Sequence, residues 1–165
     1  MRLAAHESES LWATHGNVEP WLSPGRAGGF PVIIMCWGSN TWGQLGDNTT
    51  IRKLVPTYVS ETATDNVSVS PGGRHTCSLT SAGRVKCWGF NSWGALGDGT
   101  NTDSTTPVTV PGLQLGVIAV SAGRYHTCAI AQTGQAACWG SNDYGPVGDG
   151  TYNDRSTPVS VLDFP

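Results

Sequence analysis

Apolar residues along most of the chain fall in short segments, each bounded by Gly, Pro or other turn-forming residues. One stretch has four such segments, at residues 107–110, 117–121, 126–130 and 135–139. The stretch before it has the same four, at residues 56–59, 67–70, 75–79 and 85–88. This pattern predicts short β-strands joined by tight turns, and long helices are not expected.

The strands recur because the sequence itself repeats. Cys-Trp-Gly stands at residues 36–38, 87–89 and 138–140, so the period is 51 residues. A Gly-x-x-His-Thr-Cys motif keeps the same spacing, starting at Gly72 and again at Gly123. One four-stranded antiparallel sheet per repeat is the form of a propeller blade. We therefore predict an all-β fold of β-propeller blades.

The number of repeats predicts an incomplete propeller of about two full blades plus two partial ones. Residues 32–37 are expected to supply the last strand of an earlier blade, and residues 158–161 the first strand of a later one. Residues 89–106, rich in Gly, Asn, Asp and Thr, are expected to form a loop between blades. The predicted organisation is a repeat domain over residues 32–165 after a non-repeat segment, residues 1–31, which is either a flexible tail or sequence foreign to the fold.

So few blades cannot close a ring, and an open array leaves strand edges and blade faces uncovered. Two explanations follow. The chain is a fragment of a larger propeller protein, which we favour, or it completes its propeller with other copies. Self-association through the open blade edges is therefore a second expectation about its partners.

The recurring motifs resemble those of the regulator of chromosome condensation repeat family, in a Cys-Trp-Gly form of bacterial type. The motifs are Gly-x-x-His-Thr-Cys, Cys-Trp-Gly-x-Asn-x-Trp/Tyr-Gly-x-x-Gly-Asp and Pro-x-x-Val, and they cover roughly residues 32–165. The resemblance implies a seven-bladed propeller. Activities in the family include nucleotide exchange on a small GTPase, ultraviolet sensing and inhibition of β-lactamase, and the fold selects none of them. Ultraviolet sensing would need tryptophans where this chain has Gly73-Arg74 and Arg124-Tyr125, so it is not expected.

Composition removes several classes of function. Only 13% of residues are charged and the formal net charge is -3, so we expect no nucleic-acid partner. The chain has no apolar run of the length that spans a membrane, and its first thirty residues lack the apolar core of a secretory signal. The expected partner is a protein or a surface ligand, and no cofactor is expected.

The cysteines favour two disulfides. Cys77 with Cys87 and Cys128 with Cys138 are each ten residues apart and flank one hairpin, which places the members of each pair opposite each other. We favour disulfides over buried free thiols, with Cys36 left alone because residue 26 is Arg. Disulfides predict an extracellular or cell-surface protein whose export signal lies upstream of Met1, whereas reduced cysteines would indicate the cytoplasm.

The polar residues that recur once per repeat suggest structural roles. His75 and His126 are expected to hydrogen-bond to a neighbouring turn. Calcium is conceivable beside the Gly-Asp residues, but Arg52 replaces a second Asp in the first repeat and no bidentate Glu follows. We therefore favour turns in which each aspartate accepts backbone amides. These aspartates are Asp47, Asp98 and Asp149.

The aromatic residues divide into two groups. Three tryptophans at strand ends are expected to pack between blades: Trp37, Trp88 and Trp139. Others lie beside the Gly-Asp residues in the loops and are candidate binding residues: Trp42, Trp93 and Tyr144. We interpret the chain as a non-catalytic binding or scaffold module that uses these loops. The alternative is a carbohydrate-binding or hydrolytic module acting on extracellular polymers, although hydrolysis would need paired carboxylates at one site.

Overall fold

The computed structural model describes residues 18–22, 33–60, 65–113 and 116–163. All regular structure in these residues is β-strand, and every strand pairing is antiparallel, so the predicted all-β fold is confirmed. The described residues contain no helix that is long and apolar enough to cross a membrane.

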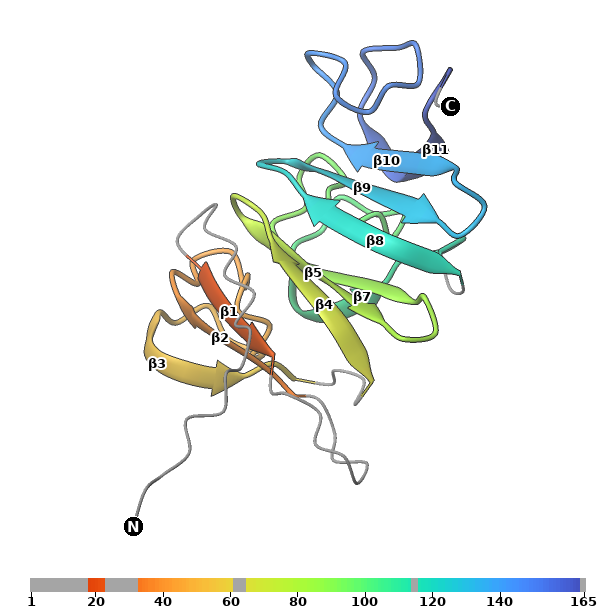
Figure 1. Cartoon of the computed structure of the whole chain (residues 1–165). Coiled ribbons are helices and arrows are strands. Elements are labelled where there is room, and N and C mark those ends of the chain that lie inside the picture. The colour runs from red at the N-terminus through yellow and green to blue at the C-terminus, as the bar shows by residue number, and fades with distance from the viewer. Residues whose placement is uncertain (1–17, 23–32, 61–64, 114–115, 164–165) are drawn as a thin grey trace.

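The strands form three sheets that follow one another along the molecule (Figure 1). The first sheet has the order β1 (Val18–Leu22), β2 (Ile34–Gly38) and β3 (Lys53–Tyr58). The second has the order β4 (Asn66–Pro71), β5 (His75–Thr80), β6 (Val85–Gly89) and β7 (Ser104–Thr109). The third contains β8 (Val117–Ala122), β9 (His126–Ala131), β10 (Ala136–Gly140) and β11 (Arg155–Ser160). Two full four-stranded blades were predicted and two are present, although each combines different strands from those predicted.

The grouping of strands into blades differs from the prediction. The Pro-x-x-Val strand was expected to begin a blade, but it is the last strand of the preceding one: β7 pairs with β6, placing Val108 opposite Cys87. Likewise β11 pairs with β10, so residues 158–161 complete the third sheet and do not begin a later blade. The long segment between β6 and β7 is thus a loop within a blade, and the crossover to the next blade is the short segment after β7.

The first sheet also differs from the prediction. Residues 32–37 were expected to end a blade, but β3 follows β2 in the same sheet. On its other side β2 pairs with β1, which lies in the segment placed outside the repeats. Residues 1–17 and 23–32 of that segment lie outside the described residues. In the β1–β2 register Cys36 faces Pro20, whereas we expected Arg26 at that place.

Each pair of neighbouring sheets encloses its own apolar cluster. Leu45, in the loop between β2 and β3, and Val59, directly after β3, pack with Trp88 of the second sheet. Trp139 of the third sheet packs with Leu96 and with residues of the second sheet. Both tryptophans are completely buried, whereas Trp37 in the first sheet is partly exposed. The core of this protein therefore lies between blades, not inside any one of them.

Two hairpin disulfides join β5 to β6 and β9 to β10. Cys77 stands opposite Cys87, and Cys128 stands opposite Cys138. Both pairs form disulfides, as predicted from their ten-residue spacing, and the Cα atoms within each pair are 4.1 Å apart. Cys36 is a buried free thiol, and burial, followed by the negative charge of Asp47, raises its pKa to about 12.

The disulfide arrangement predicts a thiol count. Unreduced protein, unfolded in denaturant and titrated with a thiol reagent, should show one reactive thiol per chain, because Cys36 alone lacks a bonded partner. Cys36→Ala protein should show none. Five reactive thiols in the freshly purified unreduced protein would contradict the two disulfides.

Candidate functional site

The loops that follow β2, β6 and β10 are held by one recurring asparagine. In the second loop the Asn91 side-chain amide donates to the Asp98 carboxylate and to the Thr100 carbonyl oxygen, at 3.2 and 3.1 Å. Its oxygen accepts the Leu96 amide at 2.9 Å. The same bonds recur between Asn40 and Asp47 and between Asn142 and Asp149. This network fixes the loop backbone through a buried side chain.

The three aspartates of these loops are acceptors of local hydrogen bonds. Asp98 accepts the Thr100 amide, and the corresponding amides in the other loops donate to Asp47 and Asp149. Burial alone would raise the pKa of Asp149, but hydrogen bonds from Thr151 and Arg155 outweigh it and lower that pKa to about 2. Within the described residues, no group of three or more His, Cys, Asp or Glu side chains is placed to hold a metal ion.

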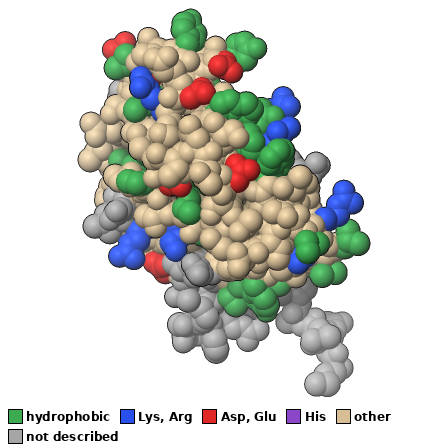
Figure 2. Space-filling model, turned by 180° about the vertical axis from the view of Figure 1, so that it is seen from behind, with side chains coloured by type: hydrophobic (Ala, Val, Ile, Leu, Met, Phe, Trp, Pro, Cys, Tyr) green, Lys and Arg blue, Asp and Glu red, His purple; other side chains and the backbone are tan. Residues whose placement is uncertain are grey.

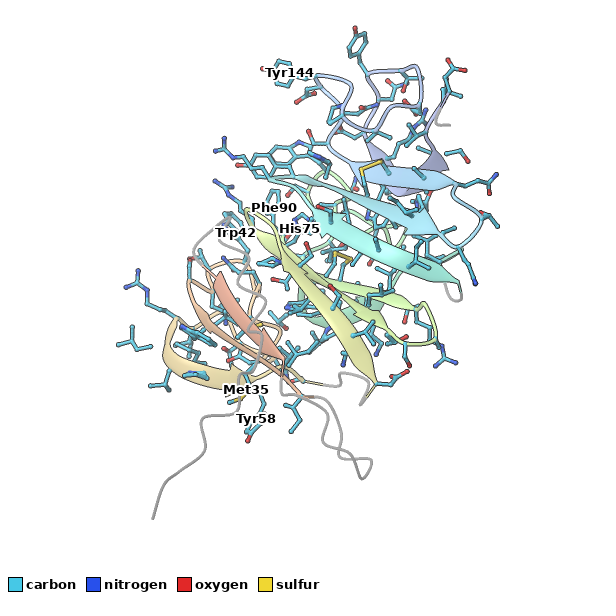
Figure 3. All side chains as sticks on the ribbon, viewed as in Figure 1. Met35, Trp42, Tyr58, His75, Phe90 and Tyr144 are labelled. Atoms are coloured by element: carbon cyan, nitrogen blue, oxygen red, sulfur yellow. A yellow bond between two sulfur atoms is a disulfide. The ribbon has the colours of Figure 1, made fainter. Side chains whose placement is uncertain are left out.

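A cluster of aromatic and arginine side chains lies where the loops and turns of all three sheets meet. Figure 3 labels two of its members, Trp42 and Phe90, beside each other. Their ring centroids are 4.9 Å apart, and Phe90 lies 5.1 Å from Trp93. Tyr125 adjoins both Phe90 and Trp93, at 6.0 and 4.7 Å. All of these contacts are edge-to-face except the tilted one between Phe90 and Tyr125, and together they join the three sheets at one end of their strands.

Two guanidinium groups lie on these rings. Arg74 lies over Trp42, Phe90 and Tyr125, with its guanidinium carbon 5.2, 5.6 and 5.3 Å from the respective ring centroids. Arg124 lies 5.0 Å from the Tyr125 centroid. Stacking on an aromatic face leaves the N–H edge of a guanidinium available to a carboxylate. We call these six residues the aromatic–arginine cluster: Trp42, Arg74, Phe90, Trp93, Arg124 and Tyr125.

Neither arginine of the cluster contacts a carboxylate of the described residues. The ion pairs in the described part of the chain are Lys53 with Asp47 and Arg155 with Asp149, and each joins a loop aspartate to the first residue of the strand that follows the loop. Arg124 is exposed and Arg74 is half-buried. The cluster therefore presents two cations on a rigid apolar base, and the described part of the chain gives them no counter-ion.

The turns that carry the arginines are tied to the neighbouring loop. The Phe90 amide donates to the Arg74 carbonyl oxygen at 3.0 Å, and the Ser141 amide donates to the Tyr125 carbonyl oxygen at 2.9 Å. A Cβ at Gly89, which has φ +109°, would lie 2.7 Å from the Arg74 carbonyl oxygen. Only glycine permits this close approach, so the third residue of Cys-Trp-Gly fixes the arginine-bearing turn.

His75 lies buried next to Arg74 and links the second sheet to the third. Its Nε2 is 2.8 Å from the Thr127 hydroxyl oxygen, which donates its own proton to the Ala95 carbonyl oxygen. Nε2 must therefore be the donor in this hydrogen bond. Burial, followed by the charge of His126, lowers the pKa of His75 to about 4.

Only some of the candidate binding residues predicted from the sequence lie in the aromatic–arginine cluster. Trp42 and Trp93 enter the cluster, whereas Tyr144, their counterpart in the third sheet, projects into solvent with 96% of its surface exposed. The three aspartates hold the loops and lie outside the cluster.

The sequence analysis missed four members of the cluster: Arg74, Phe90, Arg124 and Tyr125. The signal for Arg74, Arg124 and Tyr125 is variation inside a fixed motif, because the two middle residues of Gly-x-x-His change between repeats and include an arginine each time. Phe90 follows Cys-Trp-Gly, at a position where the other two repeats have serine.

The regulator of chromosome condensation (RCC1) repeat pattern matches residues 34–79 and 82–130, which is more than half of the chain. The chain belongs to the RCC1 repeat family. A second form of the RCC1 repeat matches residues 67–94 and 117–145. The predicted family is thus confirmed, and these residues include most of the second and third sheets.

Two curated proteins show the similarity in sequence. The RCC1 repeats of this chain are 35% identical over 127 residues to the ultraviolet-B receptor UVR8 of Arabidopsis thaliana, covering 76% of this chain and 29% of that protein. They are 34% identical over 130 residues to the human E3 ubiquitin-protein ligase HERC2, covering 78% of this chain and 3% of HERC2. The chain therefore spans less than a third of either relative.

Solved RCC1-type propellers share the fold. Yeast RCC1 (Prp20), crystallised bound to Kap60, matches with a TM-score of 0.75 and 19% identity over 90% of this chain and 36% of that one. Human WBSCR16 matches with a TM-score of 0.75 and 24% identity over 90% of this chain and 38% of that one. The three sheets are thus arranged as blades of an RCC1 propeller.

The buried neutral His75 predicts a pH dependence of stability. A lowered pKa in the folded state means that the unfolded state takes up the proton first. The contribution of His75 is therefore complete above pH 6.5 and is lost as the pH falls through about 4, by up to about 3 kcal/mol. Urea unfolding between pH 7 and pH 4 measures it. His75→Gln protein should lose much less stability over this range, and an equal loss in both proteins would contradict the assignment.

Proposed function

We propose that this chain is a non-catalytic protein-binding module, and that its aromatic–arginine cluster binds an acidic segment of a partner protein. The observation that carries the proposal is the convergence of four aromatic side chains from three sheets around two guanidiniums that pair with no carboxylate of the described residues. Aromatic residues and arginine supply most of the binding energy in protein interfaces. A guanidinium also pairs with a carboxylate through two parallel hydrogen bonds.

The loops give this surface the rigidity that tight binding needs. Each loop that contributes a tryptophan is fixed by its buried asparagine, and the turns carrying the arginines are tied by backbone hydrogen bonds. A partner would therefore meet side chains that lose little conformational entropy on binding. Protein binding is also in keeping with yeast RCC1 (Prp20), which was crystallised bound to Kap60.

The setting that we propose is an extracellular or cell-surface protein, and the two hairpin disulfides support it because such bonds persist outside the reducing cytosol. We further propose that the chain functions within a larger propeller, because it spans 29% to 38% of the similar proteins UVR8, yeast RCC1 and WBSCR16. The ligase activity in the name of HERC2 is not extended to this chain, which covers 3% of that protein.

Binding of a fluorescent peptide of alternating Glu and Gly residues tests the proposal, with fluorescence anisotropy as the readout. Arg74→Gln and Arg124→Gln should each weaken binding about tenfold, because each removes one charge-assisted contact. Added salt should weaken binding in the original protein. Arg84→Gln is the matched control, because Arg84 is exposed on the β5–β6 turn at the opposite end of the strands.

Three results would contradict the proposal: absence of binding at low salt, equal weakening by Arg84→Gln, or binding of a neutral glycan panel in place of the peptide. The last result would favour the carbohydrate-binding alternative. Trp93→Ala protein then provides a check, because a sugar platform should fail without this ring even when both arginines are intact.

A further inference from the structure

The chain contains two copies of Asn-x-Ser/Thr, the acceptor motif for N-linked glycans: Asn48-Thr49-Thr50 and Asn66-Val67-Ser68. Such a glycan is bulky and hydrophilic, so a folded protein can carry it only where the asparagine side chain reaches solvent. Asn48 is exposed in the loop between β2 and β3, whereas Asn66 begins β4 and is only 3% exposed. The fold therefore leaves one candidate acceptor, Asn48.

The loop does not need a side chain at residue 48. The φ of Asn48 is +61°, and Gly99 and Gly150, one and two periods later, have φ +87° and +77°. Glycine meets this left-handed requirement in both later loops, and asparagine is a residue with a side chain that tolerates it. The Asn48 amide donates to the Thr105 carbonyl oxygen at 3.0 Å, and the Gly99 amide makes the equivalent bond to the third sheet. The side-chain amide of Asn48 is therefore additional to what holds the loop.

The hydroxyl that the motif requires is also particular to the first loop. Thr50 stands where the second loop has Asn101 and the third has Tyr152. Its neighbour Thr49 has the structural role, because the Thr49 hydroxyl donates to Asp47 at 2.7 Å and the same bond recurs in the other two loops. Thr50 is exposed, and its hydroxyl makes no hydrogen bond within the described residues. The first loop thus differs from the others at both residues that the motif needs, and keeps the threonine between them.

Asn48 lies at the outer rim of the blades. The first strands of the sheets adjoin one another, β1 beside β4 and β4 beside β8, so they lie toward the centre of the arrangement (Figure 1). β7 is at the opposite edge of its sheet, and Asn48 meets it at Thr105, whose hydroxyl donates to Asn48 Oδ1 at 3.3 Å. Further blades of a larger propeller are added around the centre, so they leave the rim between the first and second sheets open. The Asn48 Nδ2 has no hydrogen-bond partner in the described residues.

We propose that Asn48 carries an N-linked glycan. In the transfer, the Asn48 Nδ2 bonds to C1 of the first sugar of an oligosaccharide carried on a lipid diphosphate. The bond between C1 and the diphosphate oxygen breaks, the lipid diphosphate leaves, and one amide proton passes to the transferase. This proposal rests on the extracellular setting proposed above, because the motif is used on exported chains.

A glycan would give this protein hydrophilic surface that its charged residues do not supply. Only 13% of residues are charged, and in Figure 2 the Lys, Arg, Asp and Glu side chains are separate spots on a largely uncharged face. Charged side chains normally keep a protein surface soluble. Ile51, three residues after Asn48, is 66% exposed, so a sugar chain on this loop would add solvated surface beside an apolar side chain.

Expression of the full chain behind a cleavable export signal in mammalian secretory cells tests the proposal. Trypsin separates the two motifs, because it leaves Asn48 in the peptide of residues 27–52 and Asn66 in that of residues 54–74. Mass spectrometry before and after enzymatic removal of N-linked glycans should find sugar on the first peptide and none on the second. Chain retained inside the secretory pathway is digested and measured in the same way as secreted chain, so secretion itself is not required for the result.

Three variants locate the modification. Asn48→Gly introduces the residue that the other two loops have at this position, so it should abolish the glycan and leave the fold unchanged. Thr50→Val should also abolish the glycan, because it removes the hydroxyl of the motif. Thr50→Ser is the matched control: it keeps a hydroxyl at the same exposed position and should retain the glycan.

An unmodified peptide of residues 27–52 in the original chain would overturn the proposal, and so would sugar on Asn66 in place of Asn48. Equal glycan content in Thr50→Val and Thr50→Ser protein would overturn it as well. Thiol titration of the same exported chain shows whether the extracellular setting fails with the glycan, since only reduced cysteines would contradict that setting. Peptide binding at the aromatic–arginine cluster is measured independently, because the glycan and the peptide engage different residues.

Discussion

One backbone carbonyl at each sheet junction determines how this protein is built. The oxygens of Gln44 and Ala95 each accept an indole N–H and a threonine hydroxyl from the next sheet, and both tryptophans are completely buried there. A buried donor left without an acceptor costs about 1 to 3 kcal/mol, so a sheet of this type needs the loop of its neighbour. The loop must in turn hold its carbonyl in place, and the buried asparagines do this.

This constraint explains why so much of the 51-residue repeat is polar or glycine. The asparagine, the Gly-Asp pair and the glycines with positive φ shape a loop that approaches the next sheet closely. The same loops also place Trp42 and Trp93, each two residues before the carbonyl of its junction, in the aromatic–arginine cluster. Folding and the proposed binding surface therefore depend on the same loops.

The sequence predicted the features that depend on local spacing. The strands, the two disulfides and the aspartate-centred turns all follow from residues within about ten positions of each other. The predicted grouping of strands into blades was wrong. A 51-residue repeat can be divided into blades either at the loop before the Pro-x-x-Val strand or at the segment after it, and the sequence of that strand does not show which neighbouring strand it pairs with. β1 was missed because its sequence shares no motif with β5 or β9. The cluster was missed in part because its residues meet only when three sheets come together.

The burial and bonding of the tryptophan N–H groups is the most direct test of this account. Hydrogen exchange of the indole N–H groups, followed by NMR in dilute protein, separates the three positions of the Cys-Trp-Gly motif. We expect slow exchange at Trp88 and Trp139, whose N–H groups are bonded to Gln44 and Ala95, and fast exchange at Trp37. Equally fast exchange at all three indoles would contradict the claim that these carbonyls hold the sheets together.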